Sequence, residues 1–278
     1  MTASTSYGSR GRAAAGFTLV EVAVALVIIS LLLGSILVPL EKQIENRKYD
    51  ETQRILDQAR EAVIGFVAAN GYFPCPADYA GVSTGGEALG GHASPGSCAA
   101  SVTGGGTAGV YIGYLPAVTL GFTPIDANGY AVDAWGITAN RIRYAVSGQN
   151  VGGATRPFVS SNNSTNGMRA ATMSSIMGAS LLAVCNTTTG SSATDCASAA
   201  TRLTSNAIAV IWSLGPNAAT TGGTSADEAK NAQVLGSADR VFIKRDKSNV
   251  TGSEFDDVVT WISPPTLFSR LLAAGQLP

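Results

Sequence analysis

One acidic residue, Glu21, stands near the start of an otherwise apolar stretch. The residues from Val22 to Leu40 carry no charge, and valine, isoleucine and leucine predominate among them. As a helix this run would rise about 28 Å, which is close to the hydrocarbon thickness of a bilayer. An unpaired carboxylate in lipid costs at least about 2.5 kcal/mol. The chemistry that these residues predict is therefore the pairing of the Glu21 carboxylate with a cation.

Such a cation becomes available if the chain is cut between Gly16 and Phe17. The new α-amino group would then lie one helical turn from Glu21. The segment before the cut is short and polar, and its charges are Arg10 and Arg12. An ordinary secretory signal is cut after its apolar core, not before it, and has a shorter core. A plain membrane anchor would have no reason to keep Glu21.

The string Gly-Phe-Thr-Leu-Val-Glu at residues 16–21, with its basic leader, resembles the N-terminus of type IV prepilins and of type II secretion pseudopilins. The resemblance implies that residues 1–16 are a leader peptide, that a prepilin peptidase cleaves after Gly16, and that the same enzyme N-methylates Phe17. It also implies that Glu21 pairs with the N-terminus of a neighbouring subunit during filament assembly. Other pilin or pseudopilin subunits and an inner-membrane assembly platform would be the further partners.

Composition limits the function of the remaining chain. Lysine and arginine total 18 against 19 acidic residues, and without the leader 16 basic residues remain. No basic block is present, so we expect no nucleic-acid partner. Apolar residues make up 45% of the chain and charged residues 13%, which indicates a folded protein with a weakly charged surface. The length of 278 residues suits one sizeable domain with insertions.

Four cysteines follow the apolar run, and four cysteines allow three disulfide connectivities. The spacing favours the local pairs Cys75–Cys98 and Cys185–Cys196, because each pair brackets a loop rich in Gly, Ser and Thr. Closing loops of this size stabilises a fold by about 3 kcal/mol each in the entropy model, provided that the compartment is oxidising. Zinc is the alternative, but no Cys-x-x-Cys spacing occurs and His92 is the only histidine.

The hydropathy pattern predicts a helical spine followed by a head. Residues 17–40 are the expected transmembrane and assembly half of the spine, and 41–72 its amphipathic soluble half, with a kink favoured at Pro39 and a stop at Asn70-Gly71. Residues 73–278 form the expected periplasmic head. Strands are predicted at 110–115, 141–146, 207–214, 241–244 and 257–262, a short helix within 173–184, and a helix from Pro264 to Gly275.

These elements, with the resemblance, predict an α+β pilin-like fold: a long N-terminal helical spine packed on an antiparallel β-sheet head with loop insertions. The alternation of Ile142, Tyr144 and Val146 indicates a strand with one buried face. Residues 81–109 and 148–205 are rich in Gly, Ser, Thr and Asn and are the predicted inserted loops.

The head also resembles the major type II secretion pseudopilin, through residues 133–136, the strand ending near Tyr144, and residues 213–217. That resemblance implies a calcium ion in a loop after the sheet, although the loop here is longer and less acidic. The corresponding ligands would be the Leu214 carbonyl, Asn217, Asp256 and Asp257, with Asp227, Glu228 and Glu254 as possible additions. The alternative is that these acids face solvent or cap turns. Apart from this possible structural calcium we expect no cofactor.

The predicted function is that of a structural subunit, not an enzyme. It would insert in the inner membrane by a single pass, with its head in the periplasm, and then enter a periplasmic pseudopilus or an extracellular pilus. One alternative is a minor pilin whose loops carry an adhesin or tip function. The other is a membrane-anchored periplasmic enzyme. A nucleophilic triad in it would need His92 as its base. An acid–base pair of Asp256 and Asp257 is disfavoured, because adjacent residues of a strand point to opposite faces.

Overall fold

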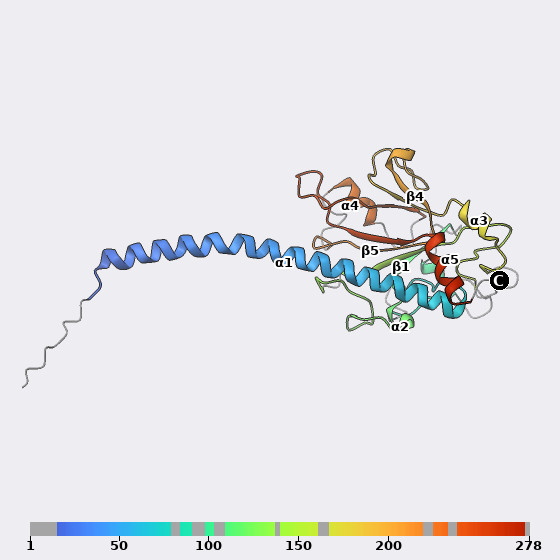
Figure 1. Ribbon diagram of the computed structural model, residues 1–278, viewed down its shortest axis with the longest axis horizontal. Coiled ribbons are helices and arrows are strands. Elements are labelled where there is room, and N and C mark those ends of the chain that lie inside the picture. The colour runs from blue at the N-terminus through green and yellow to red at the C-terminus, as the bar shows by residue number, and fades with distance from the viewer. Residues whose placement is uncertain are drawn as a thin grey trace, which may run out of the picture. The chain divides into compact units, whose positions relative to one another are not determined.

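The computed structural model describes residues 16–78, 84–90, 98–102, 109–136, 140–160, 167–218, 225–232 and 238–275, and the side chains of these residues except 33–40. The chain divides into two compact units, residues 1–47 and 48–278 (Figure 1). Helix α1, Leu19–Asn70, begins in the first unit and ends in the second. The predicted leader lies outside the described residues apart from Gly16, and so does His92.

Within the second unit α1 has one buried face. Its buried positions recur every three or four residues, as an amphipathic helix requires, and they are Thr52, Ile55, Leu56, Ala59, Val63, Ile64 and Val67. The helix ends at the predicted stop. Gly71 has a φ of 79°, and its N–H donates to the carbonyl of Val67 at 2.7 Å. The left-handed conformation is one that glycine adopts without steric cost.

A four-stranded antiparallel sheet lies against α1. Its strands are β1 (Val110–Tyr114), β2 (Arg143–Ser147), β5 (Ala209–Ser213) and β7 (Val258–Ile262), in the order β1-β2-β5-β7. All four overlap strands predicted from the sequence. One face of the sheet shares a buried core with α1 and with the last helix, α5 (Pro264–Ala273) (Figure 1). The α+β class and the antiparallel sheet are thus confirmed.

A second, three-stranded sheet covers the other face. It has the order β4-β3-β6, from β4 (Arg202–Ala207), β3 (Leu182–Cys185) and β6 (Val241–Ile243). Strands β3 and β6 are parallel, whereas β3 and β4 are antiparallel with shifts in register. Side chains from both sheets form one core, including Val210 and Trp212 from β5 and Phe242 from β6. The head therefore has three layers: helices, the four-stranded sheet and the small sheet.

The small sheet corrects three predictions. Residues 148–205 are not simply an inserted loop, because they contain α3 (Met173–Met177), β3 and most of β4. The short helix predicted within 173–184 is right for α3 alone, since residues 182–185 pair as a strand. The strand predicted to have one buried face is buried on both. One face, with Ile142, Tyr144 and Val146, packs toward the helices, and Ala145 on the other face is buried against the small sheet.

A buried polar network joins the sheet to the segment before β2. The Asp133 carboxylate accepts hydrogen bonds from Trp135 N (2.9 Å), Asn140 Nδ2 (3.0 Å) and Ser213 Oγ (2.5 Å). Burial is the largest influence on this carboxyl and raises its pKa, although these hydrogen bonds oppose the rise. The next residue, Ala134, donates its N–H to Thr52 Oγ1 of α1 at 3.2 Å. The network therefore links the helix to the end of β5.

Four shorter helical pieces complete the described part: α2 (Ala117–Leu120), α4 (Ala226–Asn231) and single 3-10 turns at Ala100–Val102 and Ala199–Thr201. Helix α4 lies against β6 and is joined to the sheet by a hydrogen bond from Trp212 Nε1 to the Asn231 carbonyl (3.0 Å). Helix α4 is absent from the elements predicted from the sequence.

We expect Leu56→Ala to lower the free energy of unfolding by about 2–5 kcal/mol, because it opens a cavity between α1 and the sheet. The matched control is Gln58→Ala, two residues away on the exposed face, which should change stability by less than about 0.5 kcal/mol. Urea unfolding of the full chain in detergent, with the disulfides intact, measures both. Equal stability of the two variants would show that α1 does not depend on this packing.

Candidate functional site

The start of α1 holds the residues to which the sequence assigns assembly chemistry. Residues 16–18 are not helical, and the helix begins at Leu19. Thr18 caps it: its Oγ1 accepts the Glu21 N–H at 3.2 Å, and its carbonyl accepts the Val22 N–H at 3.2 Å. A threonine at this position satisfies an N–H that has no partner inside the helix. Phe17 and Glu21 thus lie on either side of the Thr18 cap in the sequence, Phe17 before the helix and Glu21 in its first turn.

Both of these side chains are available to a partner. The Phe17 ring is 80% exposed, and Glu21 is exposed in the first turn of the helix. An acid in the first turn interacts favourably with the positive end of the helix dipole. Gly16 has nothing within 4 Å of the position that a Cβ atom would occupy. Nothing in the described fold therefore requires glycine at position 16.

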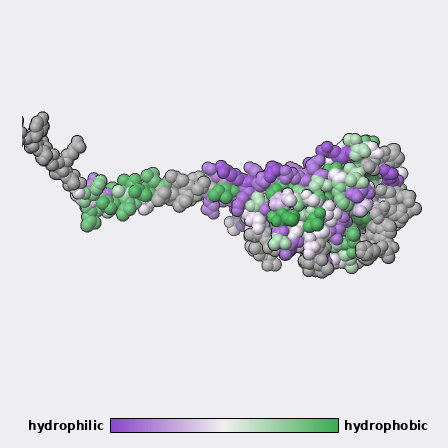
Figure 2. All heavy atoms as spheres, turned by 90° about the horizontal axis from the view of Figure 1, so that it is seen from below, coloured by the Kyte–Doolittle hydropathy of each residue, from purple (hydrophilic) through white to green (hydrophobic). Residues whose placement is uncertain are grey.

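The first turns of α1 carry an apolar surface that the described residues leave uncovered. Every large apolar side chain from 17 to 32 is at least 47% exposed, and these are Phe17, Leu19, Val20, Val22, Val24, Leu26, Val27, Ile28, Ile29, Leu31 and Leu32. Figure 2 shows this surface in the hydrophobic colour and the following charged part of α1 in the hydrophilic colour. The apolar residues point in all directions around the helix, not along one stripe.

Within the described part of the chain, no helix is both long and apolar enough to cross a membrane. The transmembrane half predicted at residues 17–40 is therefore not supported by the structure. The side chains of residues 33–40, which belong to that segment, lie outside the described part.

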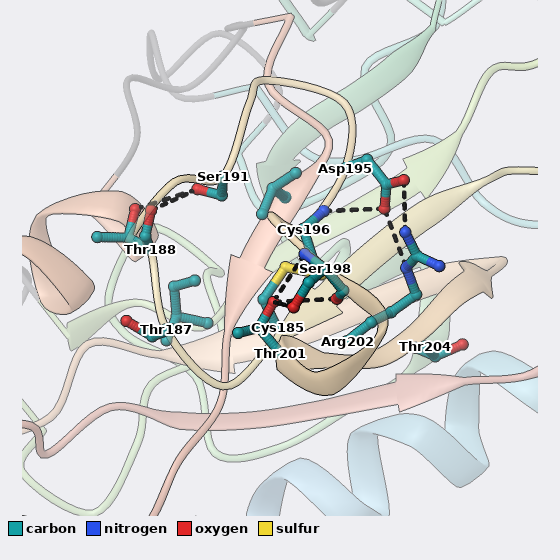
Figure 3. Close-up of a disulfide and its surroundings, with 12 residues drawn as sticks. Cys185, Thr187, Thr188, Ser191, Asp195, Cys196, Ser198, Thr201, Arg202 and Thr204 are labelled. Carbon is teal, nitrogen blue, oxygen red and sulfur yellow. Dashed lines mark hydrogen bonds and ion pairs between the residues drawn. A yellow bond between two sulfur atoms is a disulfide. The ribbon is translucent and has the colours of Figure 1, made fainter.

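The four cysteines form the two disulfides that the spacing favours, Cys75–Cys98 and Cys185–Cys196. Cys185 ends strand β3, and Cys196 is buried beside it. Asp195, next to the second bridge, forms a bidentate ion pair with Arg202 of β4 (Figure 3). Arg202 Nε donates to Asp195 Oδ1 at 3.1 Å, and Arg202 Nη2 donates to Asp195 Oδ2 at 2.7 Å. The bridge and the ion pair both connect residues 195–196 to the small sheet.

The loop that the second disulfide closes is also attached to α4. Asp227 Oδ1 accepts the Thr188 N–H at 2.7 Å, and Lys230 Nζ donates to the Ser192 carbonyl at 3.2 Å. The other Asp227 oxygen lies 3.2 Å from Arg245 Nε. Asp227 is thus occupied in joining this loop to the neighbouring elements.

The predicted calcium positions lie on two loops that the structure brings together. Glu228 of α4 connects them: one carboxylate oxygen accepts from Asn217 Nδ2 and the other from Asp256 N, both at 3.1 Å. Gly215, with a φ of 66°, allows this approach, because a Cβ atom there would lie 2.3 Å from Asp256 Oδ1. Glu228 is buried, so it neither faces solvent nor lies free in a loop.

Two other predicted positions lie apart from this contact. Asp257 points to Asn231, whose Nδ2 donates to Asp257 Oδ2 at 2.8 Å. Glu254 accepts the Gly252 N–H at 2.8 Å and so caps its own turn, as the alternative interpretation predicted. Among the described residues, no group of three or more His, Cys, Asp or Glu side chains is arranged to hold a metal ion. A structural calcium ion at these positions stays a prediction.

Asp257 is the most strongly perturbed acid of this cluster. Burial raises its pKa well above the ordinary value; the Asn231 hydrogen bond lowers the pKa, whereas the nearby charges of Asp256 and Glu228 raise it. Arg143 opposes that rise as the positive neighbour. Burial and two neighbouring carboxylates thus act together to raise the pKa of Asp257.

Comparison with known proteins gives the class of the N-terminus. Residues 11–37 match the family model described as the prokaryotic N-terminal methylation motif. This motif is the signature of type IV pilins, pseudopilins and other prepilin-like proteins, so the predicted resemblance is confirmed for the segment that contains Gly16, Phe17 and Glu21. No curated protein and no solved structure matches the chain.

We expect Asp257→Asn to flatten the pH dependence of stability. A pKa that is raised in the folded state stabilises the protein fully below the unfolded value of about 4, and this contribution is lost as the pH rises through the folded pKa. The neutral amide removes that loss. Thermal unfolding from pH 4 upward should therefore show a smaller decline for Asp257→Asn than for the wild type, with the exposed Asp246→Asn as control. Parallel curves for all three proteins would contradict this role.

The same titration with calcium or with a chelator tests the predicted ion. A bound divalent cation relieves the repulsion among these carboxylates. At pH values above the folded pKa of Asp257, calcium should therefore raise the unfolding temperature of the wild type more than that of Asp257→Asn. Magnesium is the control for ionic strength. An unfolding temperature that calcium and chelator leave equal would remove calcium from the description of this loop.

Proposed function

We propose that this protein is a structural subunit of a type IV pilus or a type II secretion pseudopilus, processed by a prepilin peptidase and assembled through α1. One observation carries the proposal: the prepilin-type motif at residues 11–37 includes the start of a helix whose described apolar side chains are exposed on all sides. Fully burying a Val, Leu, Ile or Phe side chain is worth about 1.5–3 kcal/mol. A surface of this kind therefore drives association.

The same surface suggests two successive environments. Before assembly, lipid would cover the apolar turns of α1 and anchor the protein in the inner membrane. In a filament, the corresponding helices of neighbouring subunits would replace the lipid. No nucleic-acid partner is part of this scheme, because the sequence has no basic block. The motif points to a structural role and not to an enzyme.

Glu21 supplies the specificity of assembly in this proposal. The carboxylate is exposed in the single chain, where water solvates it. Packing among apolar helices would remove that water, and the carboxylate would then need a cation. The α-amino group that cleavage creates on Phe17 of a neighbouring subunit provides one. Pairing the two charges fixes how far one helix is shifted along the next.

We expect Glu21→Gln to be processed and folded normally but to enter filaments poorly. The amide keeps the size of the side chain and removes its charge, which leaves the neighbour's amine unpaired; removing one member of a buried charge pair costs about 3–5 kcal/mol. Glu41→Gln, an exposed glutamate of the same helix, is the matched control. Immunoblots of sheared filaments and of membrane fractions report incorporation, and mass spectrometry of the N-terminal peptide reports cleavage and methylation.

Each result has a separate meaning. A wild-type chain that keeps Met1 in cells with an active prepilin peptidase would contradict the proposed function as a whole. Cleaved Glu21→Gln that enters filaments as well as the control would contradict the charge-pairing role and leave the subunit assignment standing.

A further inference from the structure

The cap of α1 sits directly beside the bond that the peptidase is proposed to cut. The scissile Gly16–Phe17 peptide lies in the non-helical residues 16–18, and Thr18 is the residue that separates them from the first helical turn. Its side chain bonds the Glu21 N–H, so the helix begins after Thr18. Thr18 and Glu21 also have the spacing of a capping box, Thr-x-x-Glu, which marks helix starts.

The sequence itself favours a helix that starts earlier. Alanine has the highest helix propensity of all residues, and Ala13, Ala14 and Ala15 precede the cleavage position. Gly16 opposes helix formation by only about 1 kcal/mol relative to alanine. A stop signal at Thr18 is therefore needed if the residues at the cut are to stay outside the helix.

The chemistry of cleavage requires such a stop. Hydrolysis adds water across the Gly16–Phe17 amide: the C–N bond breaks, the leader keeps the new carboxylate of Gly16, and Phe17 receives a proton as its new amine. A peptide bond inside a helix is enclosed by its neighbours and holds its hydrogen bonds, so a protease reaches it only after local unfolding. A bond outside the helix requires no such opening.

We infer that Thr18 is a positioning residue for processing: by capping α1 it holds the Gly16–Phe17 bond in the non-helical form that a peptidase can bind. This inference rests on the proposed function. The residue acts through the backbone, because its hydroxyl is engaged with the Glu21 N–H and not with the scissile bond. Other residues that cap helices should therefore replace it, whereas a residue of the same shape without an oxygen should not.

Four substitutions separate a capping role from recognition of the side chain. Ser and Asn are good N-caps that differ from threonine in shape, Val has the shape of threonine but no acceptor, and Ala has neither. We expect Thr18→Ser and Thr18→Asn to be cleaved at nearly the wild-type rate. Thr18→Val and Thr18→Ala should be cleaved about five-fold more slowly, which is the rate equivalent of about 1 kcal/mol, the usual cost of losing a cap. The assay uses the full chain in detergent micelles with purified prepilin peptidase.

Hydrogen exchange at the Phe17 amide provides a second measurement that does not depend on the enzyme. In Thr18→Val this amide should exchange more slowly than in the wild type, because the helix then extends across the cut. Cleavage of Thr18→Val at the wild-type rate or faster would overturn the inference. Cleavage of Thr18→Ser and Thr18→Asn as slow as that of Thr18→Ala would also overturn it. An uncleaved wild-type chain would instead contradict the proposed function, so the two failures are distinguishable.

Discussion

The packing of one face of α1 against the four-stranded sheet is the contact on which the head depends. Six buried apolar positions of the helix, from Ile55 to Val67, share a core with β1, β2, β5, β7 and α5. This single helix also begins with turns that are apolar all round and uncovered. The difference is one of periodicity: three- and four-residue spacing leaves a polar face for solvent, whereas a continuous apolar run leaves none. One helix thus contains a part that is buried in the head and a part whose apolar side chains no other described residue covers.

Buried polar groups connect the three layers where apolar packing ends. Asp133 joins α1, through its neighbour Ala134, to the end of β5, and Glu228 joins the loops after β5 and before β7. Each of these carboxylates receives at least two hydrogen bonds, which offsets part of the cost of removing it from water. The pKa of Asp257 is raised by burial and by the charges of Asp256 and Glu228, which disfavours its ionised form. The head is thus stabilised by specific polar contacts as well as by its core.

The sequence predicted the features that have a local signal. The prepilin-type motif, the cysteine pairs, the end of α1 at Asn70-Gly71 and the strands of the main sheet all follow from spacing or alternation over a few residues. Strands β3 and β4 were missed because they are short and lie among Ser, Thr and Asn, and only pairing with distant β6 and burial against Trp212 identify them. Helix α4 does have a local signal, because the Ser225 hydroxyl accepts the Glu228 N–H and Ser-x-x-Glu is the spacing of a capping box. The position of Glu228 between two loops depends on tertiary contacts that no local pattern encodes.

The buried face of α1 also determines how the head would respond to mechanical load. A force applied along the helix axis acts parallel to its interface with the sheet, so it is a shearing force shared at once by the buried apolar side chains from Ile55 to Val67. Peeling would break the same contacts one after another. Because the strands that contact α1 are bonded to one another across the whole sheet, no single strand has to carry the load. Pulling on α1 would therefore separate the helix from the sheet only when the whole interface fails.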